Sequence, residues 1–176
     1  MIEEMVKIIP YASEWDAAID ALIDEVMGPG RYARTAERLR EGNRAIADYG
    51  FVVIDDQKNI QGTISFWPIQ IGATPSLLLG PLAIHPAFRG QGAGLNLITY
   101  ARDHILSRDP SQNPLQNLLP ILLVGDEPYY GRVGFSVAPR AIQLPGPVNP
   151  DRVLIWLPEG AAMPTGEVRA HPRAAL

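Results

Sequence analysis

Residues 85–102 read HPAFRGQGAGLNLITYAR, and they place glycine at positions 90, 92 and 94 directly ahead of a helical pattern. Glycines in alternation provide no side-chain packing and raise the entropic cost of ordering a loop. The helical pattern comes from apolar residues spaced along one helix face, namely Leu95, Ile98, Ala101 and Ile105. The first N–H groups of a helix lack intrahelical partners and attract anions, and glycine lets an anion approach them closely. The stretch therefore predicts a phosphate-binding loop at the start of a helix.

The strand before this loop is predicted from SLLLGPLAIH (76–85), a continuous apolar run typical of a central strand that is covered on both faces. Pro81 lies inside the run and has no N–H group for a sheet hydrogen bond. We therefore expect a bulge, or a neighbouring strand that separates, at this point.

The order of residues in the loop distinguishes between classes of phosphate ligand. A Walker loop requires lysine after the glycines, and a Gly-x-Gly-x-x-Gly dinucleotide loop requires glycine where Leu95 or Leu97 stands. The pattern that matches is Arg/Gln-x-x-Gly-x-Gly/Ala, as Arg89-Gly90-Gln91-Gly92-Ala93-Gly94. It resembles the coenzyme A pyrophosphate loop of the GNAT superfamily of N-acetyltransferases, in which the loop joins the fourth strand to the third helix. A glycine-rich turn without a ligand is the alternative.

A second motif, YYGRVGF (129–135), follows one helix and one apolar run later. It is similar to the aromatic-Tyr-x-x-x-Gly-Phe segment that GNAT proteins carry after the fifth strand. The resemblance implies that the hydroxyl of Tyr130 lies near the thioester sulfur and acts as general acid. A phenol suits this role because it can donate a proton to a strongly basic thiolate. Tyr129 is expected to pack in the core.

Further strings extend the resemblance over about residues 5–168, and they are similar to the bacterial YhbS-like branch of predicted acetyltransferases. These strings are LLLGPLAIHP, LLVGDEPYYGRVGF, GPGRYARTAERLREG and LPGPV. The resemblance implies an α+β GNAT fold, in which a mostly antiparallel sheet has splayed fourth and fifth strands and is flanked by helices. It also implies acetyl-CoA as co-substrate, no metal, and direct acetyl transfer to a primary amine of a small molecule or protein.

The resemblance further implies which residues bind the cofactor. The backbone N–H of Leu82 or Ala83 would contact the thioester and its developing oxyanion, because Pro81 cannot donate a hydrogen bond. The cofactor-binding set comprises Leu82, Ala83, Ile84, Arg89, Gly90, Gln91, Gly92, Ala93, Gly94 and Tyr130.

The general base is less evident, since many relatives place a glutamate on the fourth strand and residues 77–84 contain no carboxylate. His85 and Asp126 are the candidates, with Glu127 expected to be solvated. Each has a structural alternative: His85 would order the loop before Pro86, and Asp126 would cap a short helix. The missing carboxylate also leaves open a CoA-binding regulatory module without catalysis.

Arg34 and Arg38 lie four residues apart in a basic segment, where GNAT proteins shape their acceptor site. They would favour an acceptor that carries a carboxylate, such as an amino acid. A solvated helix surface is the alternative. Trp67 would line the same cleft or pack in the core.

The remaining elements follow from periodicity and turn residues. Strands are predicted at 5–11, 118–125 and 135–138, in a hairpin of 51–55 with 61–69, and finally at 152–157. Helices are predicted from Trp15 to Val26, with Ser13 and Asp16 as a cap, from about 33 to 41, and briefly over 126–132. A loop is expected at 108–117 and a loose tail from 158.

Composition narrows the function further. The chain has 176 residues, a formal net charge of −4 and no cysteine, which argues against a nucleic-acid binder and excludes disulfides and thiolate chemistry. Its three histidines are too scattered to suggest a zinc site.

We expect one GNAT domain over 1–176, with its core at about 5–157. The acidic start MIEEMVKII and the lack of a long apolar run predict a cytoplasmic protein that does not contact a membrane. The resemblance is compatible with a homodimer.

Overall fold

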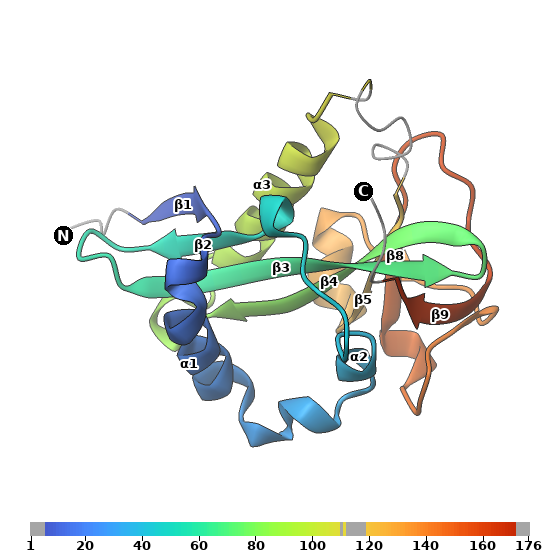
Figure 1. The fold of residues 1–176 in the computed structure, drawn as a ribbon, viewed down its shortest axis with the longest axis horizontal. Helices are drawn as coiled ribbons and strands as arrows, with labels where there is room; N and C mark the ends of the chain where they lie inside the picture. Colours follow the sequence, from blue (N-terminus) through green and yellow to red (C-terminus); the bar gives the residue numbers. More distant parts are fainter. Residues whose placement is uncertain (1–5, 110, 112–118, 172–176) are drawn as a thin grey trace.

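A mixed β-sheet runs through the centre of the protein in the computed structural model, which describes residues 6–109, 111 and 119–171 (Figure 1). The main strands follow the order β1-β2-β3-β4-β5-β8-β6, with β9 paired to β3 and β7 paired to β9. Parallel pairing joins β4 to β5 and β7 to β9, whereas the other pairs are antiparallel. The strands span Lys7–Pro10 (β1), Phe51–Ile54 (β2), Ile60–Ile71 (β3), Thr74–Ile84 (β4), Ile121–Val124 (β5), Ser136–Val137 (β6), Ile142–Gln143 (β7), Val153–Trp156 (β8) and Gly166–Ala170 (β9). This mixed sheet is the α+β arrangement that the resemblance implied.

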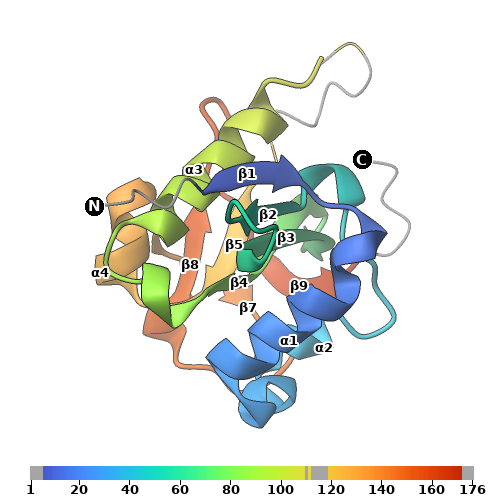
Figure 2. The same ribbon diagram turned by 90° about the vertical axis from the view of Figure 1, so that its left-hand side faces the viewer.

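Helices cover both faces of the sheet, as Figure 2 shows. They are α1 (Asp16–Met27), α2 (Thr35–Arg38), α3 (Ala93–Leu106) and α4 (Glu127–Tyr130). The predicted stripe of α3 is buried and joins a core cluster with sheet residues such as Phe66 and Leu77. On the opposite face, α1 packs Ile19, Leu22 and Ile23 against Val52 and Ala83. Because both faces are covered, the apolar run of β4 is buried as expected.

The strand β4 carries the irregularity that Pro81 predicted. In the register with β3, Leu82 pairs with Ile64 and Leu79 pairs with Phe66, so Ser65 alone opposes both Gly80 and Pro81. The Gly80–Pro81 peptide bond is cis. Pairing with β5 covers Leu77 and Leu78 and goes no further, so the two parallel strands separate beyond Leu78. Both expectations, a bulge and a splayed neighbour, are confirmed.

The early helices differ in detail from the prediction. Ser13 makes no capping hydrogen bond. It begins a 3₁₀ helix, Ser13–Trp15, and Asp16 accepts instead from the Tyr11 hydroxyl at 2.7 Å. The helix predicted over about 33–41 is reduced to α2, because a preceding 3₁₀ helix, Pro29–Ala33, ends with Arg34 in an extended conformation.

The tail from residue 158 was predicted to be loose, and the strand at 152–157 was predicted to be the last. Both predictions are wrong, because β9 pairs with β3 through Ile69, Gln70 and Ile71. Val168 of β9 is buried with those isoleucines in a second core cluster. A short strand whose partner lies about a hundred residues away leaves little trace in local periodicity.

Other boundaries shift by a few residues. The predicted strands at 118–125 and 135–138 appear as the shorter β5 and β6, and the short helix continues into a 3₁₀ turn, Gly131–Val133. Most of the loop expected at 108–117, and residue 118, lie outside the described residues. No helix in the described part of the chain is long and apolar enough to cross a membrane.

Candidate functional site

The glycine loop leads from β4 into α3. A 3₁₀ helix, Pro86–Phe88, follows β4, and Gly90 and Gly92 then adopt left-handed φ angles of +78° and +76°. Gly92 is the residue immediately before α3, and a β-carbon at either glycine would meet no atom within 4 Å. The approach to these two glycines is therefore open, and it lies at the positive end of the helix dipole. Such a cradle can hold an anion.

The separation of β4 from β5 exposes backbone groups of β4. The N–H of His85 donates to the carbonyl of Gln61 on β3 at 2.8 Å. Because amides alternate between the two sides of a strand, Ala83 also directs its N–H toward β3, whereas Leu82 and Ile84 direct theirs toward the gap. Of the two residues considered after Pro81, the geometry thus favours Leu82 as a donor into the gap.

Tyr130, the last residue of α4, lies beside this gap. Its ring contacts Phe135 and Gly125, where a β-carbon would collide with the ring. Burial is the largest cause that raises the pKa of Tyr130 to about 12, and the neighbouring Tyr129 and Asp126 add to the shift. No described residue hydrogen-bonds its hydroxyl, and Tyr130 lines a cavity that also includes Leu79 to Leu82 of β4. The phenol is thus held protonated with a free donor.

Tyr129 does not pack in the core, contrary to expectation. It is 37% exposed, and its hydroxyl lies against Gly94, in the first turn of α3. Its ring stands at right angles to that of Tyr130, 5.0 Å between centroids. Tyr129 and Tyr130 are consecutive residues of the helix α4, so their side chains project about 100° apart. Only one of the two can therefore point into the core. Tyr129 thereby connects the glycine loop to Tyr130.

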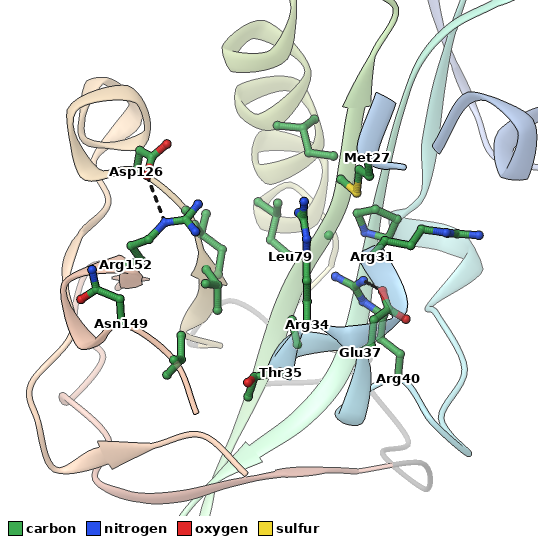
Figure 3. Close-up of a pocket in the computed structure, with 18 of the residues that line it drawn as sticks. Met27, Arg31, Arg34, Thr35, Glu37, Arg40, Leu79, Asp126, Asn149 and Arg152 are labelled. Atoms are coloured by element: carbon green, nitrogen blue, oxygen red, sulfur yellow. Dashed lines mark hydrogen bonds and ion pairs between the residues drawn. The ribbon is translucent and has the colours of Figure 1, made fainter. Parts of the chain in front are cut away.

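A cavity of about 570 Å³ opens from the gap toward α2, and Figure 3 shows its walls. One wall comes from the segment 31–40, the floor from Leu79 to Leu82 of β4, and the other wall from Asp126, Asn149 and Arg152. Arg152 donates its Nε–H to Asp126 at 3.0 Å. The glycine loop is not part of this lining, so the cavity is a compartment next to it.

Of the three residues predicted at the acceptor site, two line this cavity and one does not. Arg34 and Arg38 both line the cavity, but Arg38 donates to the carbonyl of Pro145 at 2.8 Å. Trp67 lines a different cavity, between α1, α2 and β3, and donates its indole N–H to the carbonyl of Gly80 at 2.6 Å. This hydrogen bond holds the indole of Trp67 against the bulge of β4.

The candidate bases also separate. His85 accepts from the N–H of Ala87 through Nδ1 at 3.3 Å, which matches its loop-ordering alternative, and it does not line the cavity. Asp126 does line it, paired with Arg152, and makes no side-chain cap to α4. Glu127 is exposed and lies beside Gly131.

Two cavity residues were not anticipated, Glu37 and Arg152, whereas Arg40 belongs to the basic segment predicted at the acceptor site. Glu37 and Arg40 form a close ion pair with side chains that are 18% and 13% exposed. The Arg40 guanidinium fills the space that a side chain at Gly80 would occupy, and its burial lowers the pKa of Arg40. The i, i+3 spacing of Glu37 and Arg40 is a visible signal of a pair, but not of its burial. No group of three or more potential metal ligands occurs among residues 6–109, 111 and 119–171.

Comparison with known proteins agrees with this architecture. The family model for the acetyltransferase (GNAT) domain matches residues 47–137. No curated protein sequence gives a significant match. The fold is similar to that of the GNAT family N-acetyltransferase YhbS from Escherichia coli, crystallised with CoA (TM-score 0.72, 23% identity, 94% of this chain and 89% of that chain). It is also similar to a GNAT family acetyltransferase from Brucella melitensis in complex with acetyl-CoA (TM-score 0.65, 24% identity, 96% and 97%).

A more distant structure, Arabidopsis thaliana Naa50 with a bisubstrate analogue, has a TM-score of 0.55 and 15% identity, covering 85% of this chain and 95% of that chain. These structures share the fold, and the family model spans the strands and loop that build the gap between β4 and β5. The chain belongs to the GNAT acetyltransferase family.

Proposed function

We propose that the protein is an acetyl-CoA-dependent N-acetyltransferase, formed by a single domain over the whole chain, that acetylates a primary amine. The observation that carries this proposal is the continuity of three features. Tyr129 contacts both the glycine loop and the protonated Tyr130, and Tyr130 lines the same cavity as Leu82 beside the gap. An acyl donor with a long phosphorylated arm fits this series of features, whereas a mononucleotide would use only the loop.

The glycine loop fits the pyrophosphate of CoA. Glycine at 90 and 92 leaves the approach to the first turn of α3 open, and Arg89 is exposed beside it, with its Nε 3.4 Å from the carbonyl of Ile84. Open amides, a helix dipole and an arginine all favour two negative phosphates. Gln91 and Ala93 complete the loop with their backbone amides.

The gap fits the pantetheine arm, since Leu82 and Ile84 offer backbone groups that β5 does not use. Acetyl-CoA supplies the acetyl group as a thioester. The N–H of Leu82 would polarise the thioester carbonyl, and the Tyr130 hydroxyl would hand its proton to the departing sulfur. Holding both substrates in this gap would supply much of the acceleration.

The acceptor must lose a proton before it attacks, and the carboxylates that line the cavity are Glu37 and Asp126. Each is paired with an arginine, so a proton acceptor at either position would first have to exchange that partner for the amine or a water. Of the candidates, Asp126 is placed to receive the proton through water, and His85 is not. Loss of the proton to solvent is a sufficient alternative for an amine that is partly neutral.

Calorimetry with acetyl-CoA, followed by a thiol-release assay with amines, tests the proposal. A thiol reagent reports only released CoA, because the chain contains no cysteine. We expect saturable binding and thiol release that depends on an amine. Absence of binding would refute the cofactor assignment. Binding without transfer to amino acids, polyamines, aminoglycosides or peptides would favour a regulatory CoA-binding module.

A further inference from the structure

The cavity next to the gap is positively charged, although the chain as a whole has a net charge of −4. Its lining contains five arginines and two carboxylates: Arg31, Arg34, Arg38, Arg40, Arg152, Glu37 and Asp126. Formal charge in a partly enclosed space acts more strongly than on an open surface, because water screens it less. The excess positive charge would therefore attract an anionic group of a bound molecule.

Most of these arginines already have partners. Arg40 pairs with Glu37 and Arg152 with Asp126, each as a neutral unit. Arg31 is buried and lies 2.8 Å from a carboxylate oxygen of Asp24, and its guanidinium stacks on Tyr32. These three arginines hold the walls of the cavity in place.

Two of the five cavity arginines have no carboxylate partner among the described residues, and they differ in their contacts. Arg38 donates to the carbonyl of Pro145 and lies against Gly146, so it ties the loop 145–148 to α2. The side chain of Arg34 makes no hydrogen bond or ion pair to a described residue, and the residue is exposed. Burial is the largest cause that lowers the pKa of Arg40, and the charge of Arg34 is among the smaller ones.

The side chain of Arg34 is directed into the cavity. In Figure 3 it extends beside Leu79 on the wall formed by residues 31–40, and the guanidinium of Arg152 reaches in from the opposite wall. Leu79 directly precedes the bulge of β4. An anion held between the two arginines would therefore lie close to the place where the acetyl group is proposed to be transferred.

We infer that Arg34 is a specificity-determining residue and that the acceptor carries a carboxylate as well as its amine. This inference rests on the proposed function. The guanidinium of Arg34 donates two parallel N–H bonds to the carboxylate, an arrangement that lysine cannot reproduce. Arg152 adds charge from the opposite wall while Asp126 keeps it in position. The amine of the acceptor then points toward Leu82 and Tyr130.

The test compares carboxylate-bearing amines with matched amines that lack the charge. Free α-amino acids, ω-amino acids and the carboxamide of each are assayed by thiol release with saturating acetyl-CoA. We expect at least one acid to exceed its amide about 10- to 100-fold in kcat/KM, the range for a hydrogen-bonded charge pair. The amides have less basic amines, and thus more of the reactive neutral form, so this preference would run against intrinsic reactivity.

Arg34→Gln should then lower kcat/KM for the acid about 10- to 100-fold, mainly through KM, and leave kcat/KM for the amide within about twofold. Arg34→Lys should recover part of the loss. Arg169→Gln is the matched control, because it removes the same charge from an exposed pair on β9. It should change neither ratio.

Three outcomes would overturn the inference while leaving the proposed function intact. One is acetylation of amides or polyamines only, and another is acid turnover that Arg34→Gln does not alter. The third is an equal loss of acetyl-CoA affinity in Arg34→Gln, measured by calorimetry, which would assign Arg34 to a phosphate of CoA. Failure of the wild-type protein to bind acetyl-CoA would refute the proposed function itself.

Discussion

Tyr130 shows how the surroundings of one side chain set its chemistry. Burial raises its pKa to about 12, so the hydroxyl keeps its proton throughout the range in which an enzyme is assayed. A general acid with such a pKa matches a leaving group that becomes strongly basic as its bond breaks. The neighbouring Tyr129 is exposed, with its hydroxyl against Gly94, so it is placed to contact a ligand rather than to donate the proton.

Replacing Tyr130 with Phe should lower kcat about 100-fold or more, since proton transfer by a positioned group contributes about 10²–10⁴-fold. The ring and its contact with Phe135 remain, so the fold should be unaffected. Thiol release measured from pH 7 to 10 gives a second readout. The wild-type rate should rise with pH as the acceptor amine loses its proton, with no decline from ionisation of Tyr130 below its pKa of about 12.

Tyr129→Phe is the control for this prediction, and it should retain most of the turnover. Unchanged activity of the Tyr130→Phe protein between pH 7 and 9 would show that the sulfur takes its proton from another source.

The Glu37–Arg40 pair is an ion pair of the interior, with both side chains less than one-fifth exposed. Glu37→Gln would leave the guanidinium of Arg40 buried against Gly80 without its counter-ion. Removing one partner of a buried pair costs about 3 kcal/mol. We expect a loss of this order in the free energy of unfolding from urea titrations.

Glu167→Gln breaks the exposed pair with Arg169 and should cost about 1 kcal/mol or less. Equal effects of the two substitutions would mean that Arg40 is hydrated and does not depend on Glu37.

At the level of elements, the loop and α3 act as one unit. Gly92 has a φ of +76° and open space around it, and so does Gly160 after β8, with a φ of +83°. Leucine at either position suffers a comparable left-handed strain of about 1–2 kcal/mol. Only at Gly92 would the new side chain stand before the first turn of α3, where the phosphates are proposed to bind.

Gly92→Leu should therefore weaken acetyl-CoA binding at least about 10-fold by calorimetry, equivalent to about 1.4 kcal/mol, while Gly160→Leu leaves the affinity unchanged. Similar losses of stability in the two variants would confirm that the backbone strain is matched. Normal affinity in Gly92→Leu would contradict the role of this loop.

The elements that sequence could predict are those whose signals are local. The apolar run around Leu78, the proline inside it and the stripe on α3 each depend on neighbours a few positions away, and all three appear as expected. The extended conformation of Arg34, which shortens α2, depends on how the segment 29–33 packs, and propensity alone favours a longer helix there. Because Arg34 is extended and Arg38 lies in α2, the two side chains make different contacts. Their four-residue spacing in the sequence could not predict this difference.

For the molecule as a whole, the motifs proposed to bind the cofactor have more local sequence signals than the cavity walls and the edge of the sheet. The glycine loop and the Tyr130 motif are continuous stretches, whereas the cavity walls combine residues 31–40 with Asp126 and Arg152 from the other end of the chain. Pairing of β9 with β3 is likewise decided by contacts across about a hundred residues. Such contacts depend on complementary burial, which one sequence does not reveal.

The contribution of β9 can be measured by ending the chain early. Val168 is 1% exposed and packs in one cluster with Ile69 and Ile71, so a chain that stops after Gly160 would lose its burial and uncover apolar surface of the two isoleucines. At about 1.5–3 kcal/mol per buried aliphatic side chain, we expect the free energy of unfolding to fall by at least about 2 kcal/mol. A chain that stops after His171 keeps β9 and serves as the control.

Because Ile69–Ile71 lie beyond the bulge at Gly80 in the register of β3 with β4, acetyl-CoA affinity well below the melting temperature should be the same in both truncated chains. Equal urea midpoints for the two would mean that β9 adds nothing to stability, and the fold would then depend on β1 to β8 alone.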